Sequence, residues 1–292
     1  MIYLKNLILP SESCEDNVLN LESRTCFSGF YPFRIFPQKK LRELELDHIT
    51  MLYGGNGSGK STLLNVIAEK IGADRFCDFN NSAFFDQYLE LCNLTYRQRP
   101  KNAMILSSDD VFDYALSARA INGEINDRRA ALIEQYCDIK EKAKKDPSIM
   151  WLRGLDDYER WRDTMDIVSP KKSQSKYVKN RVNKDIDLFS NGETAKRYFF
   201  EKIDKAGIYL LDEPENSLSV EFQMELAEYI SLTARAESVQ FVIATHSPIF
   251  LSLSGAKIYN LDAKPVRCCG WTDLPNVRKY FEFFQMHKDE FR

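Results

Sequence analysis

The hydrophobic positions of this 292-residue chain form short apolar runs that are separated by segments with helical spacing. The runs have the length of buried strands. They are Met1–Leu9, Ile49–Tyr53, Ala103–Leu106, Ile208–Leu211, Gln240–Ala244 and Lys257–Leu261. Helices are predicted at Ser61–Ile71, Val220–Ala236 and Pro275–Phe291. Strands that alternate with helices indicate an α/β fold, with a mostly parallel core sheet that is covered on both faces.

The polar positions divide the chain further. Residues 1–53 are rich in predicted strands. The stretch between the runs Met1–Leu9 and Ile49–Tyr53 contains Pro32 and Pro37 and is predicted to form turns. From Asp109 to Asp187 the sequence is polar, charged and poor in glycine, which is typical of a mostly helical insertion. The predicted parts are residues 1–118 and 187–292, which form one α/β domain, and a helical insertion at 119–186.

Composition and charge fit a folded protein with no membrane partner. Hydrophobic residues make up 44% and charged residues 28% of the chain, close to the average for folded proteins. The formal net charge of −3 gives no general case for nucleic-acid binding, so any basic site must be local. No apolar run approaches the ~20 residues of a transmembrane helix. The N-terminal segment lacks the basic region and apolar core of a signal peptide.

The cysteines and histidines give no sign of a metal centre. The seven cysteines contain no CxxC pair, and the histidines stand apart at positions 48, 246 and 287. A disulfide framework is not expected either, and a reducing cytoplasm is the simplest location.

A glycine-rich octet of the form G-x-x-x-x-G-K-[ST] lies between the first predicted core strand and helix Ser61–Ile71. Glycines allow backbone N–H groups to surround phosphate oxygens, and the helix N-terminus adds its positive dipole end. Lys60 supplies a cation for the β- and γ-phosphates of ATP, and the Ser61 hydroxyl can ligate Mg²⁺. The residues predicted to bind ATP here are Gly54, Gly55, Asn56, Gly57, Ser58, Gly59, Lys60, Ser61 and Thr62.

Two adjacent carboxylates follow a second apolar run, Ile208–Leu211. A buried strand that ends in Asp places this carboxylate at the carboxyl edge of the sheet, beside the phosphate loop. We predict that Asp212 holds Mg²⁺, and that Glu213 accepts a proton from the attacking water.

A tetrapeptide about twenty residues before Asp212 is a third candidate site. It precedes the helix-like run Thr194–Ile203, and a Ser and a Gly at a helix N-terminus can bind phosphate. The alternative is an ordinary helix cap. The candidate phosphate-binding residues are Ser190, Asn191, Gly192 and Glu193, although the segment by itself fits a helix cap better.

His246 follows the predicted strand Gln240–Ala244 and is therefore expected at the same sheet edge. A histidine in this position can be a structural residue. Because it follows a second apolar strand downstream of the Asp-Glu pair, we predict that His246 contacts the γ-phosphate and takes part in catalysis.

The order of these motifs, GGNGSGKST, SNGE, YLLDEPENSLS and ATHSP, resembles the ATP-binding-cassette (ABC) ATPases, with their Walker A, signature, Walker B with D-loop, and H-loop segments. The sequence is similar to the compact soluble AAA-family ATPases related to SMC, RecF and OLD proteins, rather than to transporter subunits. The resemblance does not extend to residues 118–187. It implies an ABC-type P-loop NTPase fold with an N-terminal antiparallel β subdomain, a mostly parallel core sheet and a helical insertion.

The resemblance also implies a mechanism. Two chains pair head to tail, so that ATP on one phosphate loop meets Ser190–Glu193 of the other chain. The signature departs from LSGGQ at Asn191 and Glu193. In the family a glutamine follows the strand predicted here at Ala103–Leu106, whereas this sequence has Ser107-Ser108-Asp109-Asp110, so Asp109 is the candidate for linking Mg²⁺ and water. The candidates for stacking on adenine are Tyr31, Phe33 and Phe36.

A basic stretch precedes the signature and contains Tyr177 among its lysines. It could contact nucleic-acid phosphates, or it could be a solvated face near the acidic Asp156–Glu159. Its basic residues are Lys171, Lys172, Lys176, Lys179, Arg181 and Lys184. Trp151 and Trp161 are expected to pack the insertion.

Three functions remain open from the sequence. The first is an ATPase switch that controls an effector through a homodimer or higher homo-oligomer, for example in phage defence. The second is the ATP-binding subunit of a membrane transporter, against which the weak match near Asp109 counts. The third is a small-molecule phosphotransferase, for which no acceptor site is visible.

Overall fold

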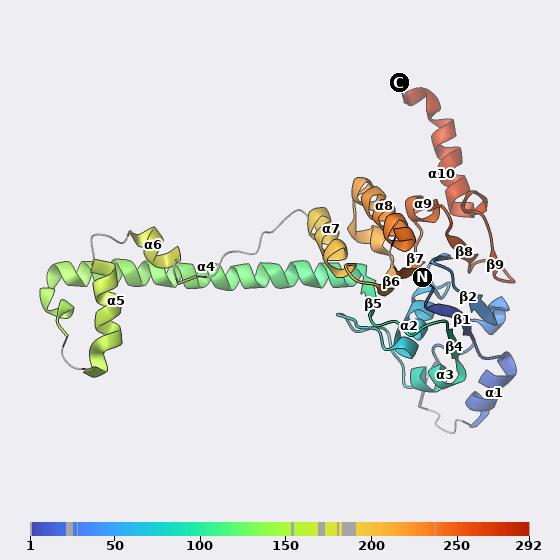
Figure 1. Ribbon diagram of the computed structural model, residues 1–292, viewed down its shortest axis with the longest axis horizontal. Coiled ribbons are helices and arrows are strands. Elements are labelled where there is room, and N and C mark those ends of the chain that lie inside the picture. Colours follow the sequence, from blue (N-terminus) through green and yellow to red (C-terminus); the bar gives the residue numbers. More distant parts are fainter. Residues whose placement is uncertain are drawn as a thin grey trace. The chain divides into compact units, whose positions relative to one another are not determined.

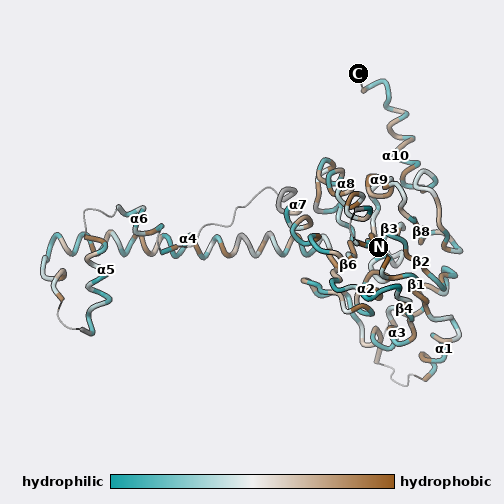
Figure 2. The backbone as a smooth tube through the Cα atoms, viewed as in Figure 1, coloured by the Kyte–Doolittle hydropathy of each residue, from teal (hydrophilic) through white to brown (hydrophobic). Residues whose placement is uncertain are grey.

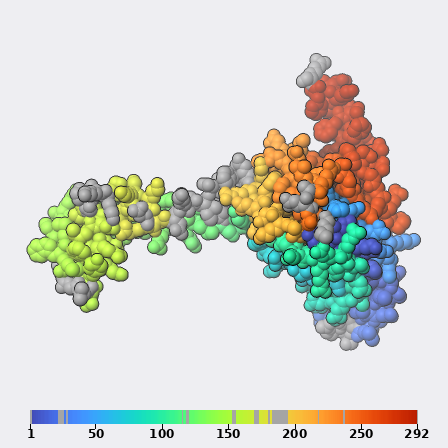
Figure 3. All heavy atoms as spheres, in the orientation of Figure 1, coloured from blue at the N-terminus to red at the C-terminus, as the bar shows by residue number. Residues whose placement is uncertain are grey.

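The computed structural model describes residues 2–21, 26–27, 29–152, 155–168, 173–179, 181–182, 191–236 and 238–291 (Figure 1). The chain forms two compact units. Unit 1 comprises Met1–Asp113 and Phe189–Arg292, and unit 2 comprises Tyr114–Leu188. In unit 1 the N-terminal part of the chain (blue) and the C-terminal part (orange and red) pack together (Figure 3).

Within the described part of unit 1, six strands form the core sheet in the order β5-β6-β7-β3-β8-β9. Their bounds are β3 Ile49–Tyr53, β5 Ala103–Ser107, β6 Gly207–Asp212, β7 Val239–Ala244, β8 Lys257–Asn260 and β9 Arg267–Cys268. All neighbouring pairs are parallel except β8 and β9. Every residue of β3 and β7 is buried, as expected for strands with both faces covered. The predicted α/β class and mostly parallel core sheet are confirmed.

A smaller antiparallel sheet contains the beginning of the chain, as predicted. Its order is β2-β1-β4. The bounds are β1 Leu4–Ile8, β2 Glu43–Glu45 and β4 Asn93–Tyr96. The Gln240 side chain of β7 ties this sheet to the core, because its Oε1 accepts hydrogen bonds from the backbone N–H groups of Tyr3 and Leu4, both at 2.9 Å.

Further helices accompany the core sheet. Their bounds are α2 Lys60–Ile71, α7 Asn191–Lys202, α8 Val220–Ala236, α9 Pro248–Leu251 and α10 Pro275–Met286. Two of them, α2 and α8, pack directly against the strands of the sheet. Leu63, Leu64 and Ile67 of α2 are fully buried, and Gly72 ends this helix at a φ of 65°. The positive φ is a conformation that glycine adopts at little cost. Outside the candidate site, the described part of unit 1 also contains the 3₁₀ turns η1 Pro37–Lys39, η5 Trp271–Asp273 and η6 Lys288–Glu290.

The prediction that the stretch between β1 and β3 consists of turns is wrong at α1, Glu12–Leu21. Helix α3, Phe85–Leu91, was not predicted. Both are short, and α1 is mostly polar, so their apolar spacing is too brief to predict a helix. They are stabilised by tertiary packing of a few side chains, among them Leu19, Phe85 and Tyr88, which belong to the core.

Helix α4, Ser108–Lys145, begins in unit 1 and continues through unit 2. Its colour changes repeatedly between hydrophilic and hydrophobic along its length (Figure 2). The other elements of unit 2 are η2 Pro147–Met150, η3 Leu155–Asp157, α5 Tyr158–Val168 and α6 Gln174–Lys179. A small core holds unit 2 together and consists of Tyr136, Ile167, Tyr177 and Val178. The Trp161 indole donates to the Met150 carbonyl at 2.9 Å.

None of the helices in the described ranges has the length and apolar character that crossing a membrane requires.

Candidate functional site

The phosphate loop runs from the end of β3 to the start of α2, as the sequence predicts. Gly57 and Gly59 have φ values of 74° and 98°, which side chains other than glycine adopt at a cost. A β-carbon on Gly54 would lie 2.5 Å from the Ser58 Oγ, so the loop cannot close around a larger residue there. Residues Asn56 to Thr62 line a cavity of about 590 Å³.

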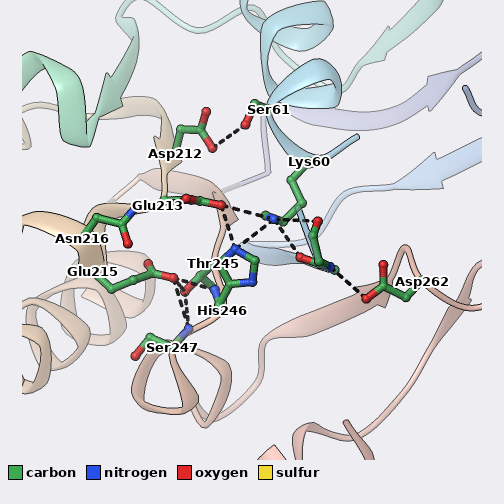
Figure 4. A network of polar contacts seen from close by, with 12 residues as sticks. Lys60, Ser61, Asp212, Glu213, Glu215, Asn216, Thr245, His246, Ser247 and Asp262 are labelled. Atoms are coloured by element: carbon green, nitrogen blue, oxygen red, sulfur yellow. Dashed lines mark hydrogen bonds and ion pairs between the residues drawn. The ribbon is translucent and has the colours of Figure 1, made fainter. Parts of the chain in front are cut away.

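Lys60 is buried and its ammonium group is surrounded by oxygen and nitrogen atoms (Figure 4). Its Nζ donates to the Gly54 carbonyl at 2.7 Å and to the Gly55 carbonyl at 3.3 Å. It lies 3.2 Å from the Glu213 Oε1 and 3.1 Å from the His246 Nε2. Three segments that are far apart in the sequence therefore meet at the Lys60 ammonium.

Glu213 follows β6 at a φ of 48°, a left-handed conformation that directs the chain into the turn η4, Pro214–Ser217. Its Oε1 lies 2.8 Å from the His246 Nε2, and its Oε2 accepts a hydrogen bond from the Asn216 amide at 3.0 Å. Burial would raise the pKa of Glu213, but the Lys60 ammonium, with help from Asn216 and His246, holds this pKa below its ordinary value. The carboxyl group is therefore ionised at neutral pH and can accept a proton.

Asp212 lies at the end of β6, and its Oδ1 accepts a hydrogen bond from the Ser61 hydroxyl at 3.1 Å. Burial raises the pKa of Asp212 to about 6, and the neighbouring Glu213 charge adds to the rise, while the Ser61 hydrogen bond opposes it. A carboxylate and a hydroxyl oxygen are the hard ligands that Mg²⁺ prefers, and a cation here would offset the burial of the Asp212 charge. Asp212 and Ser61 therefore fit the predicted Mg²⁺ site.

Asp109 and its neighbour Asp110 have different surroundings. Asp109 is exposed at the start of α4 and lines the same cavity as Asp212, so its link to Mg²⁺ stays a prediction. Asp110 is buried and accepts hydrogen bonds from the backbone N–H groups of Ser107 at 2.6 Å and Cys77 at 3.0 Å. Its carboxylate fixes the chain where β5 turns into α4.

The three aromatic candidates for adenine stacking differ in exposure. Phe33 and Phe36 are 5% and 0% exposed and belong to the core, so neither ring is available to a nucleotide. Tyr31 lines the cavity, and its hydroxyl donates to the Thr62 Oγ1 at 3.0 Å. Of the three aromatic residues, Tyr31 is therefore the remaining candidate for stacking on adenine.

Ser190 of the signature lies outside the described residues. The backbone of Asn191, Gly192 and Glu193 forms the first turn of α7, so the segment does precede a helix. Their contact with a second chain stays a prediction.

In unit 2, half of the basic run, Lys171, Lys172 and Lys184, lies outside the described residues. Lys176 and Lys179 are exposed on α6. Arg181 instead pairs with Asp163 at 3.0 Å and Asp166 at 3.3 Å. Tyr177 is 1% exposed, so its ring cannot stack on a base.

Two groups that support the site were not singled out in the sequence. Asp262 accepts a hydrogen bond from the Gly55 N–H at 2.8 Å and so fixes the phosphate loop from the end of β8. Glu215, two residues after Glu213, binds the segment that carries His246. The sequence signals that could have found them are the acidic residue that ends GAKIYNLD, which is Asp262, and the second glutamate of DEPE, which is Glu215.

Comparisons with known proteins show similarity to P-loop ATPases. Residues 111–252 match the family described as "AAA domain, putative AbiEii toxin, Type IV TA system". The tungstate uptake system ATP-binding protein TupC of Campylobacter jejuni is 26% identical over 264 residues, covering 84% of this chain and 68% of that protein.

Among solved structures, the Smc head domain of Pyrococcus furiosus bound to the C-terminal domain of ScpA is similar at 14% identity, covering 99% of this chain and 100% of that one, with a TM-score of 0.41. The SMC head domain of Thermotoga maritima is 13% identical and covers 89% and 94%, with a TM-score of 0.38. A putative metal-chelate type ABC transporter is 16% identical and covers 82% and 80%, with a TM-score of 0.38. The phosphate-loop motif at residues 54–61 and the match at residues 111–252 together indicate that the chain contains a P-loop ATPase domain, which is similar to this AAA family over the matched residues.

Proposed function

We propose that this protein is an ABC-type ATPase that binds and hydrolyses Mg-ATP between two head-to-tail copies of the chain, and that this ATP-dependent pairing controls a partner effector. The meeting of Lys60, Glu213 and His246 carries the proposal. The Glu213 Oε1 lies 3.2 Å from the Lys60 Nζ and 2.8 Å from the His246 Nε2. A phosphate-binding cation, a candidate base and a candidate γ-phosphate contact therefore lie together at the end of the phosphate loop.

The reaction needs one proton acceptor. A water oxygen attacks the γ-phosphorus of ATP while the bond from this phosphorus to the β–γ bridging oxygen breaks, giving ADP and phosphate. Glu213 accepts the proton of the water, for which its lowered pKa keeps it ionised. Lys60 binds the β- and γ-phosphate oxygens and His246 contacts the γ-phosphate. Mg²⁺, when bound by Asp212 and Ser61, supplies positive charge that offsets the phosphate charge.

The head-to-tail pairing rests on the signature segment. Helix α7 begins at Asn191, and a helix N-terminus favours negative charge. Ser190, Asn191, Gly192 and Glu193 of one copy would contact the γ-phosphate held by the other. The family resemblance supports this arrangement.

The effector is proposed from the family description, which refers to a toxin and a type IV toxin–antitoxin system. A nucleotide-controlled toxic effector, as used in antiviral defence, fits an ATPase of this kind. Nucleic acid is a further candidate partner, through the exposed Lys176 and Lys179. Arg181 contributes less because Asp163 and Asp166 already neutralise it.

A second candidate function is the ATP-binding subunit of a membrane transporter. The similarity to TupC favours it. Co-purification of the native complex separates the two candidates: a membrane permease among the bound proteins supports transport, and a soluble effector supports the switch.

The Glu213→Gln variant tests the proposed reaction. Gln cannot accept the proton, so hydrolysis should fall by roughly 10²–10⁴-fold while Mg-ATP still binds. Sedimentation should then show a chain that pairs only with Mg-ATP, and adding Ser190→Arg should abolish the pairing. Glu221→Gln, an exposed glutamate of α8, is the matched control and should behave like the wild type.

The two possible failures of this test would overturn different parts of the proposal. Wild-type hydrolysis in Glu213→Gln would move the base to another residue. Slow hydrolysis without any ATP-dependent change in assembly would keep Glu213 as the base but overturn the head-to-tail pair.

A further inference from the structure

A single carboxylate oxygen, the Glu215 Oε1, accepts three hydrogen bonds from the segment that carries His246 (Figure 4). The donors are the Thr245 hydroxyl at 2.8 Å, the His246 backbone N–H at 2.5 Å and the Ser247 backbone N–H at 3.1 Å. Glu215 belongs to η4, which follows β6, whereas the donors follow β7. The contact therefore joins the carboxyl ends of two neighbouring strands.

Gln223 of α8 adds a second link between the same two segments. Its Oε1 accepts a hydrogen bond from the Ser247 hydroxyl at 2.7 Å. Its Nε2 donates to the Leu218 carbonyl at 3.1 Å and to the Glu215 carbonyl at 3.4 Å. The segment after β6 and the segment after β7 are thus fixed to each other by two side chains.

These links determine where the His246 ring lies. The Glu215 Oε1 holds the His246 backbone and both neighbouring residues, so the backbone position from which the ring projects is fixed. The ring then reaches the Glu213 Oε1 at 2.8 Å and the Lys60 Nζ at 3.1 Å. Glu213 itself precedes η4 directly, so the base and the γ-phosphate contact share one support.

The second oxygen of the Glu215 carboxylate indicates more than a structural role. The Glu215 Oε2 is buried and has no hydrogen-bond partner in the described part of the chain. A buried acceptor without a partner costs free energy, and a role in catalysis is one explanation for keeping such a group.

We infer that Glu215 is a positioning residue for ATP hydrolysis that acts through His246 and is assisted by Gln223. The inference rests on the proposed function for its activity readout.

Kinetics give the first test. Glu215→Ala should lower kcat by roughly tenfold to a hundredfold, because a small misplacement of a catalytic contact has effects of this size. Affinity for a fluorescent ATP analogue should stay within about twofold, since Glu215 does not touch the phosphate loop. Glu215→Gln keeps an acceptor oxygen and should retain most of the activity, and Gln223→Ala should show a smaller loss. Glu221→Ala changes an exposed glutamate of α8 and is the control, which should match the wild type.

A double-mutant cycle separates positioning from general damage to the fold. If Glu215 acts through His246, Glu215→Ala should cost no more than about twofold in a His246→Ala background. Full additivity of the two losses would overturn the inference, as would equal losses in Glu215→Ala and Glu215→Gln together with a large drop in melting temperature.

Histidine NMR provides a readout that does not depend on hydrolysis. The chain has three histidines, so ring-labelled protein gives three sets of ring signals, and His246→Ala assigns the relevant set. In Glu215→Ala the His246 signal should shift or broaden, while the signals of His48 and His287 stay in place. An unchanged His246 signal would overturn the inference even if the wild type hydrolysed no ATP, whereas loss of hydrolysis in the wild type alone would overturn only the proposed function.

Discussion

Gly207, at the start of β6, packs so closely against Asn102 that a β-carbon on Gly207 would lie 2.2 Å from the Asn102 carbonyl oxygen. The same carbonyl accepts a hydrogen bond from the Ile208 N–H at 3.0 Å, so it cannot move away without breaking the pairing of β5 with β6. Gly207 is therefore a requirement of the core sheet.

Gly207→Ala should destabilise unit 1 by about 1–3 kcal/mol, the usual cost of overpacking, or more if β5 separates from β6. Thermal unfolding followed by circular dichroism measures the change. Gly123→Ala is the control, because its β-carbon would meet no atom within 4 Å and it lies inside α4, where Ala should stabilise the helix by up to about 1 kcal/mol. Equal melting temperatures for Gly207→Ala and the wild type would contradict the packing argument.

The sequence predicts the core sheet better than its surroundings for a physical reason. β3 and α8 begin and end where apolar spacing places them. A buried strand is a continuous apolar run, and a long amphipathic helix is apolar at every third or fourth residue, so both can be recognised in the sequence. α1 and β4 depend on contacts with residues distant in sequence, which no local pattern records. Ser61, Asp212 and Glu213 stand in motifs with their own spacing, whereas the contact of Glu215 with Thr245 exists only because β6 and β7 are neighbours.

Lys60→Ala should abolish ATP binding. Lys60 is the cation of the phosphate loop, and it also holds the Gly54 and Gly55 carbonyls, so its loss removes both the charge and a support of the loop. Titration with a fluorescent ATP analogue should show affinity weaker by at least about a hundredfold. Lys101→Ala, an exposed lysine, should leave affinity unchanged. Retained affinity in Lys60→Ala would remove Lys60 from the site.

Arg181→Glu should destabilise unit 2. The Arg181 guanidinium pairs with Asp163 and Asp166 and lies 4.1 Å from the centre of the Tyr177 ring. Replacing it with Glu removes a cation–π contact of about 0.5–1 kcal/mol and puts a third negative charge beside two others. The reversal of this residue therefore changes the fold as well as the surface charge.

The matched control for Arg181→Glu is Lys179→Glu, because Lys179 is exposed on α6. Hydrogen exchange of α5 and α6 should accelerate in the first variant and stay unchanged in the second. Equal exchange rates would mean that the Arg181 contacts contribute nothing measurable. Lys176→Glu and Lys179→Glu are then the variants with which to test salt-sensitive binding of DNA or RNA, since they leave the core of unit 2 intact.

Glu15 of α1 makes the stability of the fold depend on pH with a sign opposite to that of most carboxylates. Its side chain is 1% exposed, its Oε2 accepts a hydrogen bond from the Arg34 N–H at 2.5 Å, and its Oε1 has no partner in the described ranges. Burial is the main cause that raises the pKa of Glu15, and the Arg34 hydrogen bond opposes it. The folded state therefore holds the Glu15 proton more tightly than the unfolded state does.

Because the folded state binds this proton more tightly, the Glu15 contribution to stability is present below the unfolded pKa of about 4.3 and is lost as the pH rises through the folded pKa. Glu15→Gln removes the charge, so relative to the wild type it should gain stability as the pH rises from about 4 to 7, by about 1.4 kcal/mol for each pKa unit of the shift. Urea unfolding at several pH values measures this difference. Glu90→Gln, an exposed carboxylate of α3, should show no such gain. If Glu15→Gln and the wild type keep a constant difference across this range, Glu15 is ionised without penalty in the folded protein, and a hydrogen-bond donor must reach its Oε1.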